Sequence, residues 1–141
     1  MEGSTQAPSK HRVLVIDDNS DMAEITSTIL ELMGHETRWS SSGREGLVEA
    51  ARFEPDIVLL DLTMPELDGY EVARRLREDF GDRPMHLVAL TGWNTPDHIA
   101  QAIAGGFDDY LIKPVDVSAL ESIMSRTVPA QGARPEIAVS R

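Results

Sequence analysis

Short apolar runs alternate with amphipathic segments along most of this chain. Aliphatic and β-branched runs predict five strands, at residues 12–16, 36–40, 57–60, 86–90 and 110–112. Each run precedes a segment of helical periodicity, and these segments predict helices at about 20–33, 42–53, 68–80, 95–104 and 116–127. Strands that alternate with helices form a parallel sheet with helices on both faces. The pattern therefore predicts a single α/β domain with a doubly wound (βα)5 fold.

Apolar positions and capping residues predict the helix faces and the helix starts. In the first helix the residues at helical spacing are Met22, Ile25, Ile29 and Leu32. In the last helix we expect four side chains to turn inward, those of Val117, Leu120, Ile123 and Met124. Two pairs have the spacing of capping boxes and predict where the second and third helices begin: Ser42 with Glu45, and Asp68 with Glu71.

The two ends of the chain carry little that a core could bury. Residues 1–11 are mostly small and polar, and residues 128–141 contain Pro, Gly and Ala, so we expect a disordered N-terminal segment and a flexible C-terminal tail around a domain at 12–127. A length of 141 residues, 41% of them hydrophobic, fits one domain with one core. No apolar run approaches the roughly 20 residues that cross a bilayer, so we expect a cytoplasmic protein without direct membrane contact.

Composition argues against several classes of function. The net charge is −11, from 24 acidic against 13 basic residues, which disfavours nucleic acids and anionic membrane surfaces as partners. The chain has no cysteine, which excludes disulfides, thiolate zinc sites and a cysteine nucleophile. The four histidines lie too far apart in the sequence to form an obvious metal site.

Polar residues collect where the predicted strands end, and ligands of open parallel sheets bind outside these carboxyl ends. The residues there are Asp17, Asp18, Asp61, Thr91 and Lys113. An Asp at a strand end is commonly a turn former, and a lone lysine is commonly a solvated surface residue, but capping alone does not bring all five groups to one edge. Clustered carboxylates repel one another, so we expect Lys113 and a hard divalent cation, Mg²⁺, to balance them. A carboxylate in such a site can be the nucleophile of phosphoryl transfer.

Four motifs, in this order along the chain, resemble those of the receiver domain of response regulators in two-component systems. They are Val13-Leu14-Val15-Ile16-Asp17-Asp18, Asp61-Leu62-Thr63-Met64-Pro65 followed by Asp68-Gly69, Leu90-Thr91-Gly92, and Lys113-Pro114. The resemblance covers about residues 12–127 and implies a flavodoxin-like, five-stranded parallel sheet of order 2-1-3-4-5.

The resemblance also implies roles for the residues at this edge. Asp61 would be the phosphoacceptor, and Lys113 would pair with a phosphoryl oxygen. The Mg²⁺ ligands would be Asp17, Asp18, Asp61 and the backbone carbonyl of Thr63.

A second group of residues would sense the phosphoryl group. Thr91 would move its hydroxyl toward the phosphoryl group, with Gly92 beside it leaving space, and Tyr110 would turn inward as the threonine moves. Trp93 occupies a position that flanks the phosphorylation site in the family. We hypothesise that its bulky ring slows autodephosphorylation.

The resemblance implies a signalling phosphoacceptor rather than an enzyme. Its phosphoryl donor would be the phosphohistidine of a histidine kinase or of a histidine phosphotransfer protein, and its output a switched partner-binding surface. The domain would act alone or as the receiver of a hybrid histidine kinase. The alternative is a metal-dependent aspartyl-phosphate hydrolase of the haloacid dehalogenase type, but that family requires a second Asp two residues after the nucleophile, where this chain has Thr63.

Overall fold

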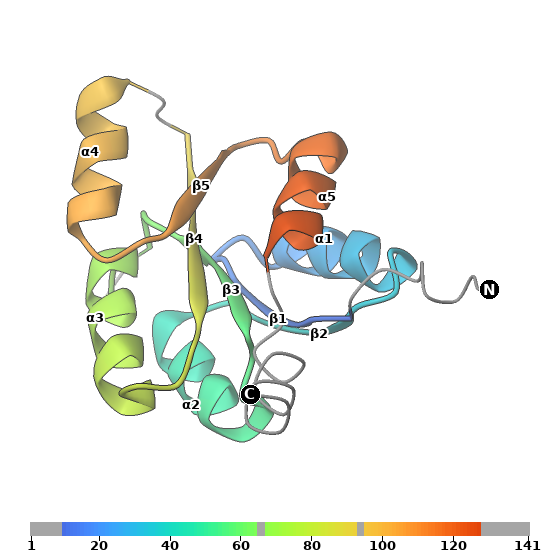
Figure 1. Ribbon diagram of the computed structural model, residues 1–141, viewed down its shortest axis with the longest axis horizontal. Helices are drawn as coiled ribbons and strands as arrows, with labels where there is room; N and C mark the ends of the chain where they lie inside the picture. Colours follow the sequence, from blue (N-terminus) through green and yellow to red (C-terminus); the bar gives the residue numbers. More distant parts are fainter. Residues whose placement is uncertain (1–9, 65–66, 93–94, 128–141) are drawn as a thin grey trace, which may run out of the picture.

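A computed structural model describes residues 10–64, 67–92 and 95–127. Strands and helices alternate along this part of the chain (Figure 1). The strands are β1 (Arg12–Ile16), β2 (Glu36–Ser40), β3 (Ile57–Asp61), β4 (His86–Thr91) and β5 (Asp109–Ile112). The helices are α1 (Ser20–Leu32), α2 (Gly43–Phe53), α3 (Gly69–Phe80), α4 (Pro96–Ala104) and α5 (Val117–Arg126).

The five strands form one parallel sheet in the order β2-β1-β3-β4-β5. This order confirms the predicted doubly wound topology. Every residue of β3 is buried, as expected for an apolar strand with a strand on each side and helices on both faces. The edge strand β2 is the most polar of the five, and two of its residues are exposed.

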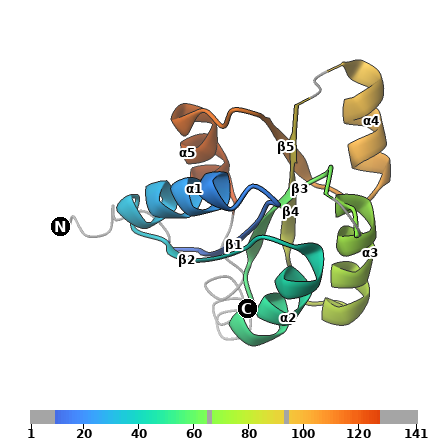
Figure 2. The ribbon, with the colours of Figure 1, turned by 180° about the vertical axis from the view of Figure 1, so that it is seen from behind.

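Helices cover both faces of the sheet (Figures 1 and 2). On one face α1 and α5 pack on a core that includes Val13, Leu59 and Leu120. On the other face α2 and α3 pack on a second core that includes Leu14 and Leu60. Successive residues of β1 and β3 point to opposite faces, so the same two strands supply both cores. None of the helices in the described ranges is long and apolar enough to span a membrane.

The predicted helix starts are confirmed by the caps. Ser42 accepts a hydrogen bond from the backbone N–H of Glu45 at 3.2 Å, and Asp68 accepts one from Glu71 at 3.0 Å. Each bond satisfies an N–H that the first turn of a helix leaves without an intrahelical partner. The cap at Asp68 fixes where α3 begins, which matters because α3 starts directly behind the end of β3.

Two of the four residues in the predicted apolar stripe of α1 do not face the core, although Ile29 packs against it. Ile25 is 52% exposed and Leu32 is 83% exposed. The buried residues of this helix are Ala23, Thr26, Ser27 and Leu30. The inner face combines small or polar side chains with Leu30, while Ile25 and Leu32 are left toward solvent.

The inward orientation predicted for Val117 is wrong, although it holds for Leu120, Ile123 and Met124. Val117 is 46% exposed because it is the first residue of α5. Side chains on a helix lean toward its N-terminus, so the side chain of a first residue extends beyond the packed turns. The packed face of α5 therefore begins one turn later.

Candidate functional site

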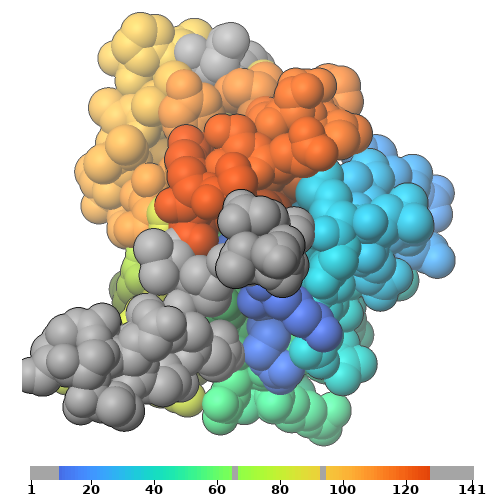
Figure 3. Space-filling view, turned by 45° about the vertical axis from the view of Figure 1, so that its right-hand side comes forward, coloured from blue at the N-terminus to red at the C-terminus, as the bar shows by residue number. Residues whose placement is uncertain are grey.

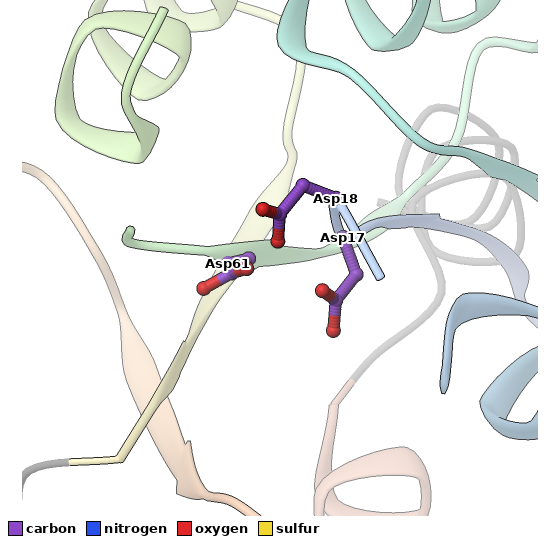
Figure 4. A group of neighbouring side chains, drawn as sticks. All are labelled: Asp17, Asp18 and Asp61. Carbon is purple, nitrogen blue, oxygen red and sulfur yellow. The ribbon is translucent and has the colours of Figure 1, made fainter. Parts of the chain in front are cut away.

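Three carboxylates meet at the carboxyl edge of the sheet. Asp17 directly follows β1, Asp18 comes next, and Asp61 is the last residue of β3. Because β1 and β3 are neighbours, with Ile16 paired to Leu60, the residues at their ends lie side by side. Carboxylate oxygens of the three aspartates lie within 4.8 Å of one another (Figure 4). Asp17 and Asp61 are buried, and Asp18 is exposed.

Lys113 lies across this cluster. Its Nζ is 3.1 Å from Oδ2 of Asp17 and 3.2 Å from Oδ2 of Asp61, so one ammonium bridges the two buried carboxylates. The residue follows β5, and its backbone N–H donates to the carbonyl of Thr91 at 2.8 Å. The Lys113–Pro114 peptide bond is cis. Burial acts to lower the pKa of the Lys113 ammonium, but the carboxylates of Asp61 and Asp17 outweigh it, so the pKa is raised.

Asp61 is poorly stabilised as an anion. Burial raises its pKa to about 7 from an ordinary 3.8, and a hydrogen bond with Asp18 and the charge of Asp17 act in the same direction. A hydrogen bond from the backbone N–H of Thr63, 3.1 Å from Oδ1, and the charge of Lys113 lower the pKa but do not outweigh the rest. The site therefore carries more negative charge than its own residues balance.

The donor set fits a hard divalent cation. Carboxylate oxygens are the preferred ligands of Mg²⁺, which commonly takes one or two carboxylates and completes its shell with water or phosphate oxygens. The oxygens of Asp17, Asp18 and Asp61 are close enough for one ion to contact all three. A cation there would relieve the repulsion that raises the pKa of Asp61.

The residues expected to sense a phosphoryl group lie at the same end of the sheet. Thr91 is buried at the end of β4, and the open space around Gly92 would admit a further atom. Tyr110 is half-buried in β5 and packs against a core cluster that also touches Leu62. Trp93 lies outside the described residues.

Two residues with no role assigned from the sequence support this edge. The backbone N–H of Asn19 donates to Oδ1 of Asp17 at 3.0 Å, while the Asn19 side chain caps α1. Gly69 lies against the end of β3, where an added Cβ would stand 2.4 Å from the carbonyl oxygen of Asp61. Glycine is therefore required where α3 approaches the backbone of Asp61. In the sequence, the feature that points to this glycine is its position directly after the capping residue Asp68.

Fold and site together define a doubly wound domain with an acidic, lysine-bridged cluster at the switch point of its sheet. Residues 13–125 match the response regulator receiver domain. The chain therefore belongs to the receiver domain family of response regulators, and it is a signalling module of two-component systems.

Relatives and solved structures agree with this membership. The response regulator MprA of Mycolicibacterium vanbaalenii is 36% identical over 136 residues, which cover 92% of this chain and 57% of that protein. The regulatory protein AtoC of Escherichia coli is 32% identical over 127 residues, covering 90% of this chain and 27% of AtoC. The chain thus spans only part of the length of these curated relatives.

Among solved structures, chemotaxis protein CheY4 of Vibrio cholerae matches with a TM-score of 0.78 and 25% identity, covering 85% of this chain and 100% of CheY4. A complex of the Saccharomyces cerevisiae histidine phosphotransfer protein Ypd1 with the receiver domain of Ssk1 matches with a TM-score of 0.77 and 26% identity. That match covers 83% of this chain and 88% of the matched chain.

Proposed function

We propose that Asp61 accepts a phosphoryl group from a phosphohistidine and that the added charge switches a partner-binding surface. The observation that carries this proposal is the bridge of Lys113 between buried Asp61 and Asp17 in a cluster with excess negative charge. A nucleophile held at the rim of the sheet, with a cation beside it, is suited to phosphoryl transfer. A purely structural lysine–carboxylate pair would not require two further carboxylates.

In the proposed reaction a carboxylate oxygen of Asp61 attacks the phosphorus of the phosphohistidine. The new O–P bond forms as the P–N bond breaks. The electron pair of the P–N bond returns to the imidazole nitrogen of the donor. Lys113, already 3.2 Å from Asp61, neutralises a phosphoryl oxygen in the transition state and in the product. The N–H of Thr63 keeps the attacking carboxylate oriented.

We assign the Mg²⁺ ligands to Asp17, Asp18, Asp61 and the backbone carbonyl of Thr63. The ion would supply positive charge to the equatorial phosphoryl oxygens. The three carboxylates would hold it beside the attacking oxygen, and the ion would offset the negative charge of Asp17 and Asp18 that helps to raise the pKa of Asp61.

The switch in this proposal consists of Thr91 and Tyr110. The hydroxyl of Thr91 would turn toward the phosphoryl group, and Tyr110 would then fill the space toward the core. Both strands that carry these residues end at the phosphorylation edge, and the backbones of Thr91 and Lys113 are hydrogen-bonded there. A change at Asp61 thus has a direct route to the β4–β5 side of the domain.

The exposed stripe of α1 is the surface we assign to the phosphohistidine donor. Helix α1 begins two residues after Asp18, and Ile25 and Leu32 lie on it at a spacing of seven residues, which places them on one face. This stripe begins at Ile25, near the acceptor, and runs along α1 to Leu32 at the far end of the helix. An exposed apolar stripe of this kind is suited to packing against a helix of the donor. The Ypd1–Ssk1 complex shows that a receiver of this fold can bind a histidine phosphotransfer protein.

The central test is phosphorylation by a small donor. The protein is incubated with acetyl phosphate and Mg²⁺, and its intact mass is compared with that of Asp61→Asn and of Asp79→Asn, which alters an exposed aspartate of α3. We expect one phosphoryl adduct on the wild type and on Asp79→Asn, and none on Asp61→Asn. Equal labelling of Asp61→Asn, or an unlabelled wild type, would contradict the assignment of Asp61. The hydrolase alternative also requires an aspartyl phosphate, and it is the family match that gives it no support.

A further inference from the structure

A buried histidine lies at the other end of the sheet, before the first strand begins. His11 is 0% exposed and precedes β1, while the buried Asp56 precedes β3. Nδ1 of His11 is 3.4 Å from Oδ2 of Asp56, and Nε2 is 2.7 Å from the backbone carbonyl oxygen of Met124 in α5. One ring thus connects two strand starts and the last turn of α5.

The partners of the ring determine its protonation. A carbonyl oxygen only accepts hydrogen bonds, so Nε2 must carry a hydrogen to bond to Met124. Nδ1 faces the carboxylate of Asp56, whose other oxygen accepts the backbone N–H of Arg12 at 2.9 Å. With acceptors at both nitrogens, the arrangement is satisfied by an imidazolium cation paired with a carboxylate.

The neighbouring His35 completes the arrangement in a neutral form. Its Nδ1 accepts the backbone N–H of His11 at 3.1 Å, and an accepting nitrogen carries no hydrogen. The two rings are 5.3 Å apart between centroids, so a second positive charge there would be repelled. Burial and then the charge of His11 lower the pKa of His35.

We propose that His11 is a pH-dependent clasp that holds the last turn of α5 against the sheet while its ring is an imidazolium. When the ring loses a proton, it cannot donate to both Asp56 and Met124. The charged carboxylate of Asp56 is the stronger acceptor and keeps the remaining N–H, so the bond to Met124 is lost and the last turn of α5 loosens. This proposal does not depend on phosphorylation of Asp61.

The surroundings of the clasp favour the cation. Burial acts to lower the pKa of His11, but its bonds to Asp56 and Met124 outweigh burial, and the pKa is raised above its usual 6.5. A raised pKa means that the clasp stabilises the fold fully below about pH 6.5 and that this stabilisation is lost as pH rises through the folded-state pKa.

Other charged groups near the clasp come from several elements. A hollow beside Asp56 is lined by charged or titratable side chains of α3, β4, α5 and the adjoining turns, namely Arg77, Arg83, His86, Asp108 and Arg126. Helix α5 lies next to the chain around the α1–β2 connection (Figure 3). A groove there is lined by His35 and Glu121 as well as Met33 and Met124. The three arginines pair with other carboxylates, Arg77 with Asp108, Arg83 with Glu54 and Arg126 with Asp109. Asp56 is the carboxylate in direct contact with His11.

The first test is an NMR titration of the wild-type histidine rings, with ring ¹⁵N shifts followed from about pH 5 to about pH 9. We expect His11 to have both ring nitrogens protonated at about pH 6 and to titrate above its usual pKa, while His35 stays neutral with Nδ1 unprotonated. A neutral His11 at about pH 6 would overturn the clasp, whatever the behaviour of any variant.

The second test measures what the clasp holds. Amide exchange in the last turn of α5, corrected for intrinsic exchange rates, is compared for wild type, His11→Gln and His98→Gln, which alters an exposed histidine of α4. We expect protection in wild type and His98→Gln to fall from low to high pH, because the clasp is lost as His11 loses its proton. In His11→Gln we expect low protection without this pH dependence. The same pH dependence in His11→Gln as in wild type would contradict the proposal.

Discussion

The two edges of the sheet bury similar groups but balance their charges differently. At the carboxyl edge the carboxylates of Asp17, Asp18 and Asp61 face the single ammonium of Lys113. At the amino edge one carboxylate, Asp56, faces one imidazole, and both of its oxygens have partners.

The difference separates a site from a structural contact. Natural proteins satisfy buried polar groups where only stability matters, and they leave local conflicts where function requires them. The pKa of about 7 at Asp61 is such a conflict, because an ordinary carboxylate is made reluctant to ionise. A cation bound among these carboxylates would relieve the conflict, whereas the Asp56–His11 contact has no such excess of negative charge.

Removal of Asp56 should have the largest effect on stability. Asp56→Ala leaves the buried His11 without its counter-charge and the N–H of Arg12 without an acceptor. Breaking a buried ion pair from one side typically costs about 3–5 kcal/mol of unfolding free energy. Urea unfolding near neutral pH measures the loss, with the exposed Asp79→Ala as the control. A loss below about 1 kcal/mol would show that the amino edge is not held by this pair.

Neutralising Asp61 should stabilise the metal-free protein, whereas removing Asp56 destabilises it. Because the folded-state pKa of Asp61 is raised from 3.8 to about 7, the metal-free protein is favoured below about pH 4 and loses stability as pH rises through about 7. A pKa shift of this size lowers the unfolding free energy at high pH by on the order of 2–4 kcal/mol. Asp61→Asn should restore this stability. Melting temperatures in EDTA, measured from about pH 4 to about pH 8, test this.

The titration of His11 affects wild type and Asp61→Asn alike, so their difference isolates Asp61. Mg²⁺ should raise the melting temperature of wild type at about pH 8 more than that of the variant, because it binds the ionised cluster. A variant that melts at or below the wild type in EDTA at high pH would contradict the electrostatic account of the carboxyl edge.

Much of this contrast could be predicted from the sequence, but only for one edge. The apolar runs determine five parallel strands, and the residues after them must then converge, which is why Asp17, Asp61 and Lys113 were found together. The residues before the strands converge as well. His11 and Asp56 are 45 positions apart, and their pairing follows from the β1–β3 register and from the approach of α5, neither of which periodicity reveals.

The outer face of α1 was unpredictable for a different reason. Periodicity detects large apolar side chains, and Ile25 and Leu32 have the spacing of residues on one helix face. The inner face contains one large apolar residue, Leu30, among small or polar residues such as Ala23 and Ser27, which hydropathy weights weakly. Which of two stripes is buried depends on how closely the helix approaches the sheet, and sequence patterns do not encode this distance.

A tight backbone contact at the carboxyl edge gives the next prediction. Gly69→Ala places a Cβ 2.4 Å from the carbonyl oxygen of Asp61, and backbone there must move. We expect a loss of about 1–3 kcal/mol in urea unfolding and slower labelling by acetyl phosphate. Gly92→Ala is the control for stability, because an added Cβ there meets no atom within 4 Å. Equal stability of the two variants would show that α3 does not constrain the end of β3.

The smallest effect on stability, and a selective one on function, is expected from the outer face of α1. Leu32→Lys replaces a side chain that is 83% exposed, so unfolding should change by no more than about 0.5 kcal/mol. If the stripe binds the donor, Leu32→Lys and Ile25→Lys should each slow transfer from a cognate phosphohistidine protein about tenfold, a difference of about 1.4 kcal/mol. Labelling by acetyl phosphate should be unchanged.

The comparison of the two donors distinguishes docking from chemistry, because the small donor needs the carboxyl edge but not α1. Val48→Lys is the matched control, since Val48 is 53% exposed on α2, on the opposite face of the sheet. It should leave both rates unaltered. If Leu32→Lys slows both donors equally, the variant has disturbed the acidic cluster itself. If it slows neither, the donor docks elsewhere and the α1 stripe has no part in transfer.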